Sequence, residues 1–500
     1  MPLALPLLLC IASGFALVSL GWSRRAPLTA DLLLRGSLSI GYGLGMFSVI
    51  LFLARVYGIT NLIAVDLTVF AALLVSFLLL RTRGTPAISV PLTKQQFDAP
   101  QFDAPPWLRR ILTGAFAIAL FAAVYSLVMR ARAHPHGDGW DAFSIWNLHA
   151  RFLFRAGLHW RDGFSPLIPW SHPDYPLLLP GAIAHFWTYL GHDDPTVPAV
   201  IGLCFTFSTV GLLFSALSIM RGRTVAMLGG LTLLTTPFFI EQGASQYADV
   251  PLSFFFLATI VLLCLHDHDL HEHDLHEHDS GNAPAAPGLL VLAGLAAGFS
   301  AWTKNEGLLF LCSILAARLL ILIHHQTRRG DSREPGRDNW IALALVLAGA
   351  GPAFLLIAWF KHSFAPPGDL FSDPAVTFHK LLAPANYWAV VKWYVKGFFR
   401  FGHWLLLPGT LLLIGFYFAA NKKEKSKPTA ALRSAVLALA LTLAGYFAIY
   451  LISPYDVYWH LHFSLTRLFL QLWPSAIFLF FLSYSCGAGP CGAGTLARVR

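Results

Sequence analysis

Charged side chains are scarce in this chain. Only 12% of its 500 residues are Asp, Glu, Lys or Arg, whereas 56% are hydrophobic, and the mean hydropathy is +0.61. Soluble globular domains carry about 25% charged residues. The composition therefore excludes a soluble globular protein and predicts an all-α polytopic membrane protein.

Other features are absent. The six cysteines form no CxxC pair, which argues against a disulfide framework and against a zinc site. The sequence shows neither a Gly-rich phosphate loop nor a soluble nucleotide-binding domain. The net charge of +9 comes from Lys and Arg clusters at the ends of apolar stretches. That distribution is typical of membrane proteins and argues against a nucleic-acid partner.

What the chain has in abundance is apolar stretches of membrane-spanning length. About thirteen transmembrane helices are predicted at roughly 20 residues each. The predicted spans are 3–22, 36–57, 60–80, 111–130, 197–220, 225–240, 247–265, 288–303, 306–323, 340–360, 402–420, 431–452 and 468–485. The first span has neither a basic segment before it nor a clear cleavage site, so we expect it to be retained.

The positions of the basic residues predict the orientation. Clusters after span 3–22, before span 111–130 and between spans 197–220 and 225–240 fall on one side if the N-terminus is outside and the C-terminus is cytoplasmic. This topology requires that 177–190 does not cross the membrane, so we expect an outer-face or re-entrant helix there. The expected location is the cytoplasmic (inner) membrane.

Three parts follow from this topology. Residues 1–109 form an N-terminal three-helix segment with a cytoplasmic linker, 110–485 form the main transmembrane module, and 486–500 form a cytoplasmic tail. A repeat of His, Asp, Glu and Leu begins at His266, in a predicted cytoplasmic loop of residues 266–287. Such a repeat binds metals weakly, but without fixed ligand geometry we expect a disordered low-complexity loop rather than a metal sensor.

The first large outer loop, 131–196, interrupts the apolar pattern with acids and aromatic residues. Asp138 and Asp141 follow span 111–130 directly, and apolar residues recur at helical spacing from Asp141 to Phe154. We expect an amphipathic helix on the outer face. Asp141 is a candidate general base, with Asp138 as the competing candidate; alternatively, Asp141 only caps the helix.

Further ionisable and aromatic residues fall on the same predicted face. They come from separate outer segments, and charge beside the membrane calls for a partner or a function. The candidate substrate-binding residues are His172, Asp174, Tyr175, Asp249, Lys304, Glu306, His460 and Arg467. Lys304 and Arg467 are suited to hold a lipid phosphate, and a carboxylate to deprotonate an attacking hydroxyl.

Four short motifs carry a resemblance. They are Gly139-Trp140-Asp141, His172-Pro173-Asp174-Tyr175-Pro176-Leu177, Tyr247-Ala248-Asp249-Val250-Pro251 and Trp302-Thr303-Lys304-Asn305-Glu306-Gly307. In their order, residues 110–470 resemble the integral-membrane glycosyltransferases of the GT-C superfamily, especially protein O-mannosyltransferases and the aminoarabinose transferase of lipid A. Ala142 departs from the second acid usual in that family, so a paired acidic motif is missing.

The resemblance implies a GT-C-like architecture and an inverting glycosyltransferase at the outer face of the membrane. Its donor would be a polyprenyl-phosphate-linked sugar, and its acceptor a hydroxyl of a glycan, lipid or protein. The base would be Asp141, which matches the family's acidic position. Family members differ in their use of a divalent metal; we expect no metal and no other cofactor here.

Two other functions fit a polytopic chain. A transporter or flippase for a lipid-linked or small polar substrate would also have many helices and buried charges, but would be expected to place the charges at mid-membrane in two related halves. A ligase for lipid-linked glycans would share the outer-face chemistry. Lys380, Lys392 and Lys396, in the predicted outer segment 361–401, fit either an anionic ligand or side chains that reach the membrane interface.

Overall fold

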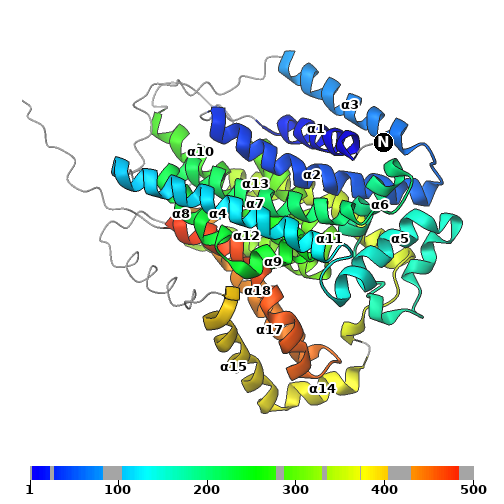
Figure 1. The fold of residues 1–500 in the computed structure, drawn as a ribbon. Helices are drawn as coiled ribbons and strands as arrows, with labels where there is room; N and C mark the ends of the chain where they lie inside the picture. Colours follow the sequence, from blue (N-terminus) through cyan, green and yellow to red (C-terminus); the bar gives the residue numbers. More distant parts are fainter. Residues whose placement is uncertain are drawn as a thin grey trace, which may run out of the picture.

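The computed structural model describes residues 3–22, 28–82, 104–276, 287–328, 335–371, 373–403 and 429–483, and within these ranges it is helical without a strand (Figure 1). The first helices are α1 (Ala4–Leu20), α2 (Leu28–Tyr57), α3 (Leu62–Thr82), α4 (Pro106–Ala133), α5 (Asn147–Arg155), α6 (Leu178–Leu190), α7 (Thr196–Arg221), α8 (Arg223–Leu234) and α9 (Pro237–Ala244). They are followed by α10 (Asp249–His276), α11 (Pro287–Thr303), α12 (Asn305–Arg328), α13 (Pro335–Ser363), α14 (Pro374–Leu382), α15 (Pro384–Arg400), α17 (Ala430–Ile452) and α18 (Val457–Ser483).

Nine helices in the described ranges are long and apolar enough to cross a membrane, which is the architecture of a multi-pass membrane protein. The other four predicted spans are not confirmed. Helices α1 and α11 have 17 residues each, about 25 Å, against a hydrocarbon core of about 30 Å. Helices α8 and α9 form a pair bent by 64°. The predicted span 402–420 lies almost entirely outside the described residues.

Helix α10 is the centre of the bundle. All of its apolar window is buried, and α10 contacts α7, α11 and α18. A helix that is apolar on every side must be surrounded by other helices or lipid, and here helices surround it. The structure differs from the predicted disordered loop, because α10 continues through His266 as far as His276. Extending an existing helix adds one hydrogen bond for each residue fixed; residues 277–286 lie outside the described ranges.

The N-terminal helices share this core. Helix α2 contacts α6 and α7, Tyr42 donates to the carbonyl of Leu292 in α11 at 2.6 Å, and Ser48 donates to the carbonyl of Leu177 at 2.7 Å. Helices before and after residue 109 therefore pack in one core. The division into domains at residue 109 stays a prediction.

Two predicted segments have different limits in the structure. The predicted amphipathic helix is a π-helical turn, Ala142–Trp146, followed by the short helix α5, whose buried side packs against α6. Helix α6 has 13 residues, too few to cross a membrane, in keeping with the non-crossing segment predicted there. Helix α18 starts at Val457 rather than at residue 468, because polar residues in its first turns hide a helix from a search for apolar stretches.

Helix α3 presents one buried acid to the bundle although only 11% of its apolar window is buried. The carboxylate oxygen Oδ2 of Asp66 accepts from the Tyr189 hydroxyl at 2.6 Å and lies 2.8 Å from Nε2 of His185. His185 Nδ1 lies 2.9 Å from the carbonyl of Phe47 and must donate to it. Asp66 therefore ties α3 to α6 and, through His185, to α2.

Replacing Asp66 by Ala should destabilise the protein by about 3 kcal/mol, because His185 and Tyr189 would stay buried without their partner. Thermal unfolding in detergent measures this as a lower melting temperature. Asp162→Ala is the matched control, since Asp162 pairs with His159 at 3.7 Å on an exposed surface. Equal melting temperatures for Asp66→Ala and the control would contradict the anchoring role.

Candidate functional site

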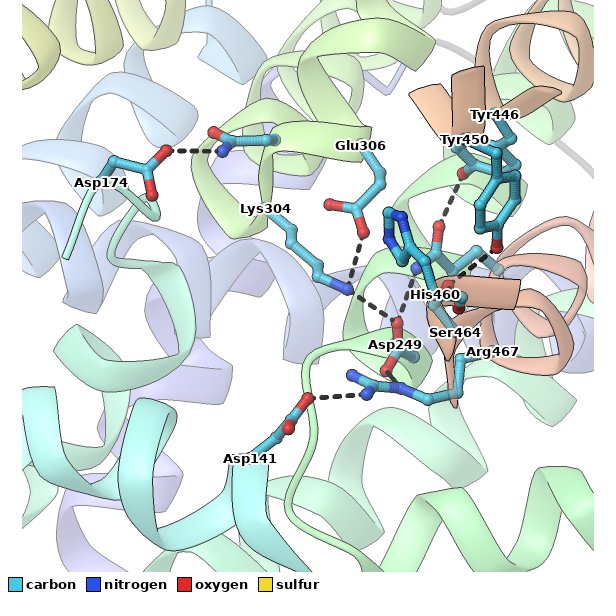
Figure 2. A network of polar contacts seen from close by, with 12 residues as sticks. Asp141, Asp174, Asp249, Lys304, Glu306, Tyr446, Tyr450, His460, Ser464 and Arg467 are labelled. Atoms are coloured by element: carbon cyan, nitrogen blue, oxygen red, sulfur yellow. Dashed lines mark hydrogen bonds and ion pairs between the residues drawn. The ribbon is translucent and has the colours of Figure 1, made fainter. Parts of the chain in front are cut away.

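Charged side chains from separate parts of the chain meet around Asp249, the first residue of α10 (Figure 2). Asp141 comes from the start of the π-helical turn after α4, and Arg467 comes from α18. Lys304 and Glu306 come from the junction of α11 and α12. The C-terminal end of α4, the start of α10 and the junction of α11 with α12 therefore lie close together. Helix α18 contributes a residue from within its length rather than from an end. We call these five residues the charge network.

Asp249 is the centre of the charge network and its side chain is fully buried. Its Oδ2 accepts from Nε of Arg467 at 2.8 Å. Its Oδ1 accepts from Nε2 of Gln471 at 2.6 Å and from Nζ of Lys304 at 3.3 Å. Figure 2 shows Lys304 and Arg467 reaching Asp249 from opposite sides. Three donors satisfy a carboxylate that would otherwise be costly to bury.

Arg467 links Asp249 to Asp141. Its Nη1 donates to Oδ2 of Asp141 at 2.6 Å, and its guanidinium group lies 4.6 Å from the ring centre of Tyr247, a cation–π contact. Arg467 lies about 15 Å from the start of α18 along the helix axis. The side chain of Asp141 is 24% exposed, so it is the accessible end of a network whose centre is sealed.

Asp141 is not a helix cap. Its side chain makes no capping hydrogen bond, and its position is set by neighbours in the preceding and following segments. Oε1 of Gln246 accepts from Asn147 at 2.8 Å, and Nε2 of Gln246 donates to the carbonyl of Pro135 at 3.1 Å. One side chain between α9 and α10 thus binds the chain on both sides of Asp141. Gly137, at φ 89°, allows this approach, since a Cβ there would lie 3.0 Å from the carbonyl of Ser245.

Lys304 is the single residue between α11 and α12. Its Nζ lies 2.7 Å from Oε1 of Glu306, and its side chain is 6% exposed. Burial alone would lower the pKa of Lys304, but the negative charges of Asp249 and Glu306 outweigh it and raise that pKa. Lys304 is therefore a buried ammonium group. The second carboxylate oxygen of Glu306, Oε2, is buried and has no hydrogen-bond partner among the described residues.

Gly307 makes this tight junction possible. A Cβ at Gly307 would lie 1.8 Å from the carbonyl oxygen of Ser300, in the preceding helix. Ser300 also donates its hydroxyl to the carbonyl of Gly307 at 3.2 Å. The close approach of α11 and α12 at this point fixes where Lys304 enters the network.

Gly307→Ala should therefore destabilise the protein by about 1–3 kcal/mol, the usual cost of overpacking. Gly114→Ala in α4 is the control, because a Cβ there meets nothing within 4 Å. The control should be neutral or slightly stabilising, by up to about 1 kcal/mol. Melting temperatures in detergent compare the two, and the prediction fails if Gly307→Ala melts no lower than Gly114→Ala.

The segment 172–176 lies beside the charge network. The ring of Tyr175 stacks between His172, at 4.7 Å between ring centres, and Trp146, at 5.7 Å. The ammonium of Lys304 lies 6.0 Å from the ring centre of Tyr175. Burial, reinforced by the charge of Glu306, raises the pKa of Tyr175. Tyr175 is therefore a neutral aromatic wall next to Lys304.

Asp174 joins this segment to α12 and α13. Its Oδ2 accepts from Asn305 at 2.9 Å and from Lys361 at 3.1 Å, and Lys361 also donates to the backbone carbonyl of Asp174. Asp369 lies 3.6 Å from His172 and accepts from the hydroxyl of Tyr455 at 2.6 Å. This second set of polar contacts is separate from Asp249, but it is linked to Lys304 through the adjacent Asn305.

Among the described residues, His172, Asp174 and Asp369 form a group that could hold a metal ion. One ligand atom of each lies within 4.8 Å of the others. Imidazole and carboxylate ligands suit zinc or a comparable divalent ion. However, the ammonium group of Lys361 already occupies Oδ2 of Asp174, so an ion at this oxygen would have to displace it.

His149 lies behind this segment and is buried. Its Nε2 lies 3.3 Å from the hydroxyl of Ser171, and its Nδ1 has no partner among the described residues. Burial, followed by the charge of His172, lowers the pKa of His149 to about 4, although Asp174 opposes the shift. The folded protein therefore holds this imidazole neutral at pH values where an unfolded chain would protonate it.

Because the pKa of His149 is lower in the folded state, its contribution to stability is complete above pH 6.5 and falls away as the pH drops towards 4. The loss should be on the order of 3 kcal/mol. His149→Gln should flatten the dependence of melting temperature on pH between 4 and 6.5. His159→Gln, at an exposed position, should leave it unchanged. Identical pH profiles for wild type and His149→Gln would contradict this assignment.

The last two predicted site residues, His460 and Asp138, lie outside the charge network. Nδ1 of His460 lies 3.1 Å from the hydroxyl of Ser453, and its ring lies 4.8 Å from that of Tyr450 (Figure 2). Asp138 is apart from the charge network. It lies 3.5 Å from Arg130, which also binds Glu241 at 2.9 Å. The structure thus joins Asp141, and not Asp138, to Arg467.

Several residues of the site were missed by sequence reasoning. Gln471 and Tyr446, joined at 2.6 Å, complete the surroundings of Asp249. Lys361 and Asp369 complete those of Asp174 and His172. Gln471 and Tyr446 are uncharged residues within apolar helices, a pattern that gives little signal. Lys361, in the last turn of α13, and Asp369, in the segment after α13, were detectable as charges.

The lysines of the segment 361–401 behave differently from one another. Nζ of Lys380 donates to the carbonyls of Ser453 and Tyr455, both at 2.6 Å. Burial lowers the pKa of Lys380. Nζ of Lys396 lies 4.9 Å from the ring centre of Trp393. These contacts favour a structural role for Lys380 and an interfacial role for Lys396 over an anionic ligand.

Comparison with known proteins found no match: no protein-family model, no curated protein and no solved structure matches the chain.

Proposed function

We propose that the chain is a membrane glycosyltransferase with a GT-C-like architecture, which moves a sugar from a polyprenyl-phosphate donor to a hydroxyl acceptor at the outer face of the cytoplasmic membrane. The observation that carries the proposal is the placement of Asp141. It is a partly exposed carboxylate held by Arg467 at the edge of a buried charge network. The N-terminus would then lie outside and the C-terminus in the cytoplasm.

The difference between Asp141 and Asp249 supports separate roles. Asp249 is fully buried and accepts three hydrogen bonds, so it positions Arg467 and Lys304 and does not reach substrate. Asp141 is 24% exposed, and one of its two oxygens is bound by Arg467. Its other oxygen is directed to no donor among the described residues and suits a general base for an incoming hydroxyl.

The cations of the network suit a lipid phosphate. An ammonium group has three donors, and Lys304 directs two of them to Asp249 and Glu306. A guanidinium group has five donors, and Arg467 uses Nε and Nη1 for its two carboxylates. Both cations therefore keep donors for phosphate oxygens, while the carboxylates hold them in place.

In the proposed step, Asp141 accepts the proton of the acceptor hydroxyl. The acceptor oxygen forms a bond to the anomeric carbon, and the bond from that carbon to the phosphate oxygen breaks. The polyprenyl phosphate leaves with the electron pair, held by Lys304 and Arg467. One displacement inverts the configuration of the sugar. Exposed Trp140 and Trp170 beside the site suit stacking against a sugar ring.

A transporter or flippase is the second candidate. The observation in its favour is the depth of Arg467 within α18 and the complete burial of Asp249, since charges inside membrane helices often mark a substrate path. Such a protein would bind a polar substrate and catalyse no transfer. A sugar-transfer assay separates the two functions.

The test is transfer of radiolabelled sugar from a panel of polyprenyl-phosphate sugars in membranes that contain the wild type, Asp141→Asn or Asp138→Asn. Asp141→Asn should lower the rate by about 100-fold or more, the usual contribution of a general base. Asp138→Asn is the control, because Asp138 lies outside the charge network, and it should stay near the wild-type rate. Equal expression and melting temperature must be shown for all three proteins.

Transfer by the wild type with inverted configuration, lost only in Asp141→Asn, would support the proposal. Loss in Asp138→Asn alone would move the base to Asp138. Absence of transfer with every donor, together with uptake of a lipid-linked or polar substrate into vesicles, would favour the transporter.

A further inference from the structure

Three arginines gather at the end of the bundle opposite the charge network. Arg109 and Arg110 lie near the start of α4, and Arg223 is the first residue of α8. Together with Thr113 they line a hollow of about 240 Å³. Asp141 follows the other end of α4, which is about 40 Å long. The hollow is therefore separate from the proposed active site.

The starts of α4 and α8 are held side by side. The backbone N–H of Ala104, just before α4, donates to the hydroxyl of Thr224 in α8 at 3.5 Å. The hydroxyl of Thr113 donates to the carbonyl of Arg109 at 2.8 Å and lies 3.5 Å from the sulfur of Met227 in α8. These contacts fix the arginines of the two helices around one space.

The charge in this hollow is not neutralised by the described residues. No carboxylate in the described ranges lies within 4.0 Å of Arg109, Arg110 or Arg223, whereas Arg130 and Arg467 each pair with two carboxylates. The N-termini of α4 and α8 lie near this hollow, and the helix dipoles add positive potential there. The three positive charges repel one another, and an anion bound in the hollow would offset this repulsion.

We propose that this hollow binds a phosphate-bearing anion through Arg109, Arg110 and Arg223. Guanidinium groups match phosphate oxygens with paired hydrogen bonds, and the two helix N-termini reinforce the same charge preference. The anion has two possible sources, the headgroup of an anionic phospholipid or free phosphate. Because the flank of α4 is exposed and apolar, with Trp107 63% and Ile111 59% exposed beside the arginines, the hollow opens next to lipid.

Native mass spectrometry of the full chain in detergent tests the site. The probes are phosphatidylglycerol, phosphatidylcholine and inorganic phosphate, added separately. The test variant is Arg109→Gln with Arg223→Gln. The control removes the same charge elsewhere, by Arg132→Gln near the far end of α4 with Arg400→Gln at the end of α15, both at exposed positions. Arg109→Lys with Arg223→Lys keeps the charge but loses the paired hydrogen bonds.

The wild type should bind phosphatidylglycerol in preference to phosphatidylcholine, and the test variant should bind it about tenfold more weakly or worse. The control should retain wild-type affinity, and the Lys variant should fall between them. Binding of inorganic phosphate that the test variant loses, without a preference for phosphatidylglycerol, would assign the site to free phosphate.

Equal loss in the test variant and the control would overturn the proposal, because only the overall charge would then matter. The proposal would also be overturned if the wild type neither preferred phosphatidylglycerol to phosphatidylcholine nor bound inorganic phosphate. Melting temperatures of the three variants show whether each is folded, and if the test variant is unfolded the Lys variant decides. The result does not depend on whether the chain transfers sugar.

Discussion

The ion pairs that Arg467 makes with Asp249 and Asp141 are the contacts on which the site depends. A buried charge without a partner costs several kcal/mol inside a membrane protein. Arg467 lies well within α18, and Asp249 begins the most enclosed helix of the bundle. Burying either charge there without the other would be unfavourable. Their pairing holds α18 against α10, and the contact to Asp141 extends the pairing to the chain that follows α4.

Around this pairing, the rest of the network is arranged by helix ends. The close contact at Gly307 brings Lys304 to Asp249, and Asn305 in the same junction binds Asp174. Two sets of polar contacts therefore share one short stretch of chain. Lys304 and Asn305 are adjacent in the chain, so the two sets are coupled through the backbone, which suits the proposed binding of a charged headgroup beside a polar acceptor.

The sequence predicted the charged members of the site because charge stands out against an apolar background. Asp249, Lys304 and Arg467 were identified in this way, although their pairing was not, since distance between segments is a property of helix packing. Gln471 was missed, because a single amide in an apolar helix has no distinctive pattern. The start of α18 was placed eleven residues too late, at 468 in place of Val457, because His460 and Arg467 interrupt the apolar stretch. The contact that sets Asp141 apart from Asp138, its ion pair with Arg467, is visible only in the structure.

Gln246 has a consequence for motion. Its side chain binds the backbone at Pro135 and the side chain of Asn147, so the segment that carries Asp141 is fastened to the turn before α10 on both sides. Asp141 and Asp249 must then move as one rigid piece. Displacing the Asp141 segment outwards would break both hydrogen bonds of Gln246 and the ion pair of Asp141 with Arg467.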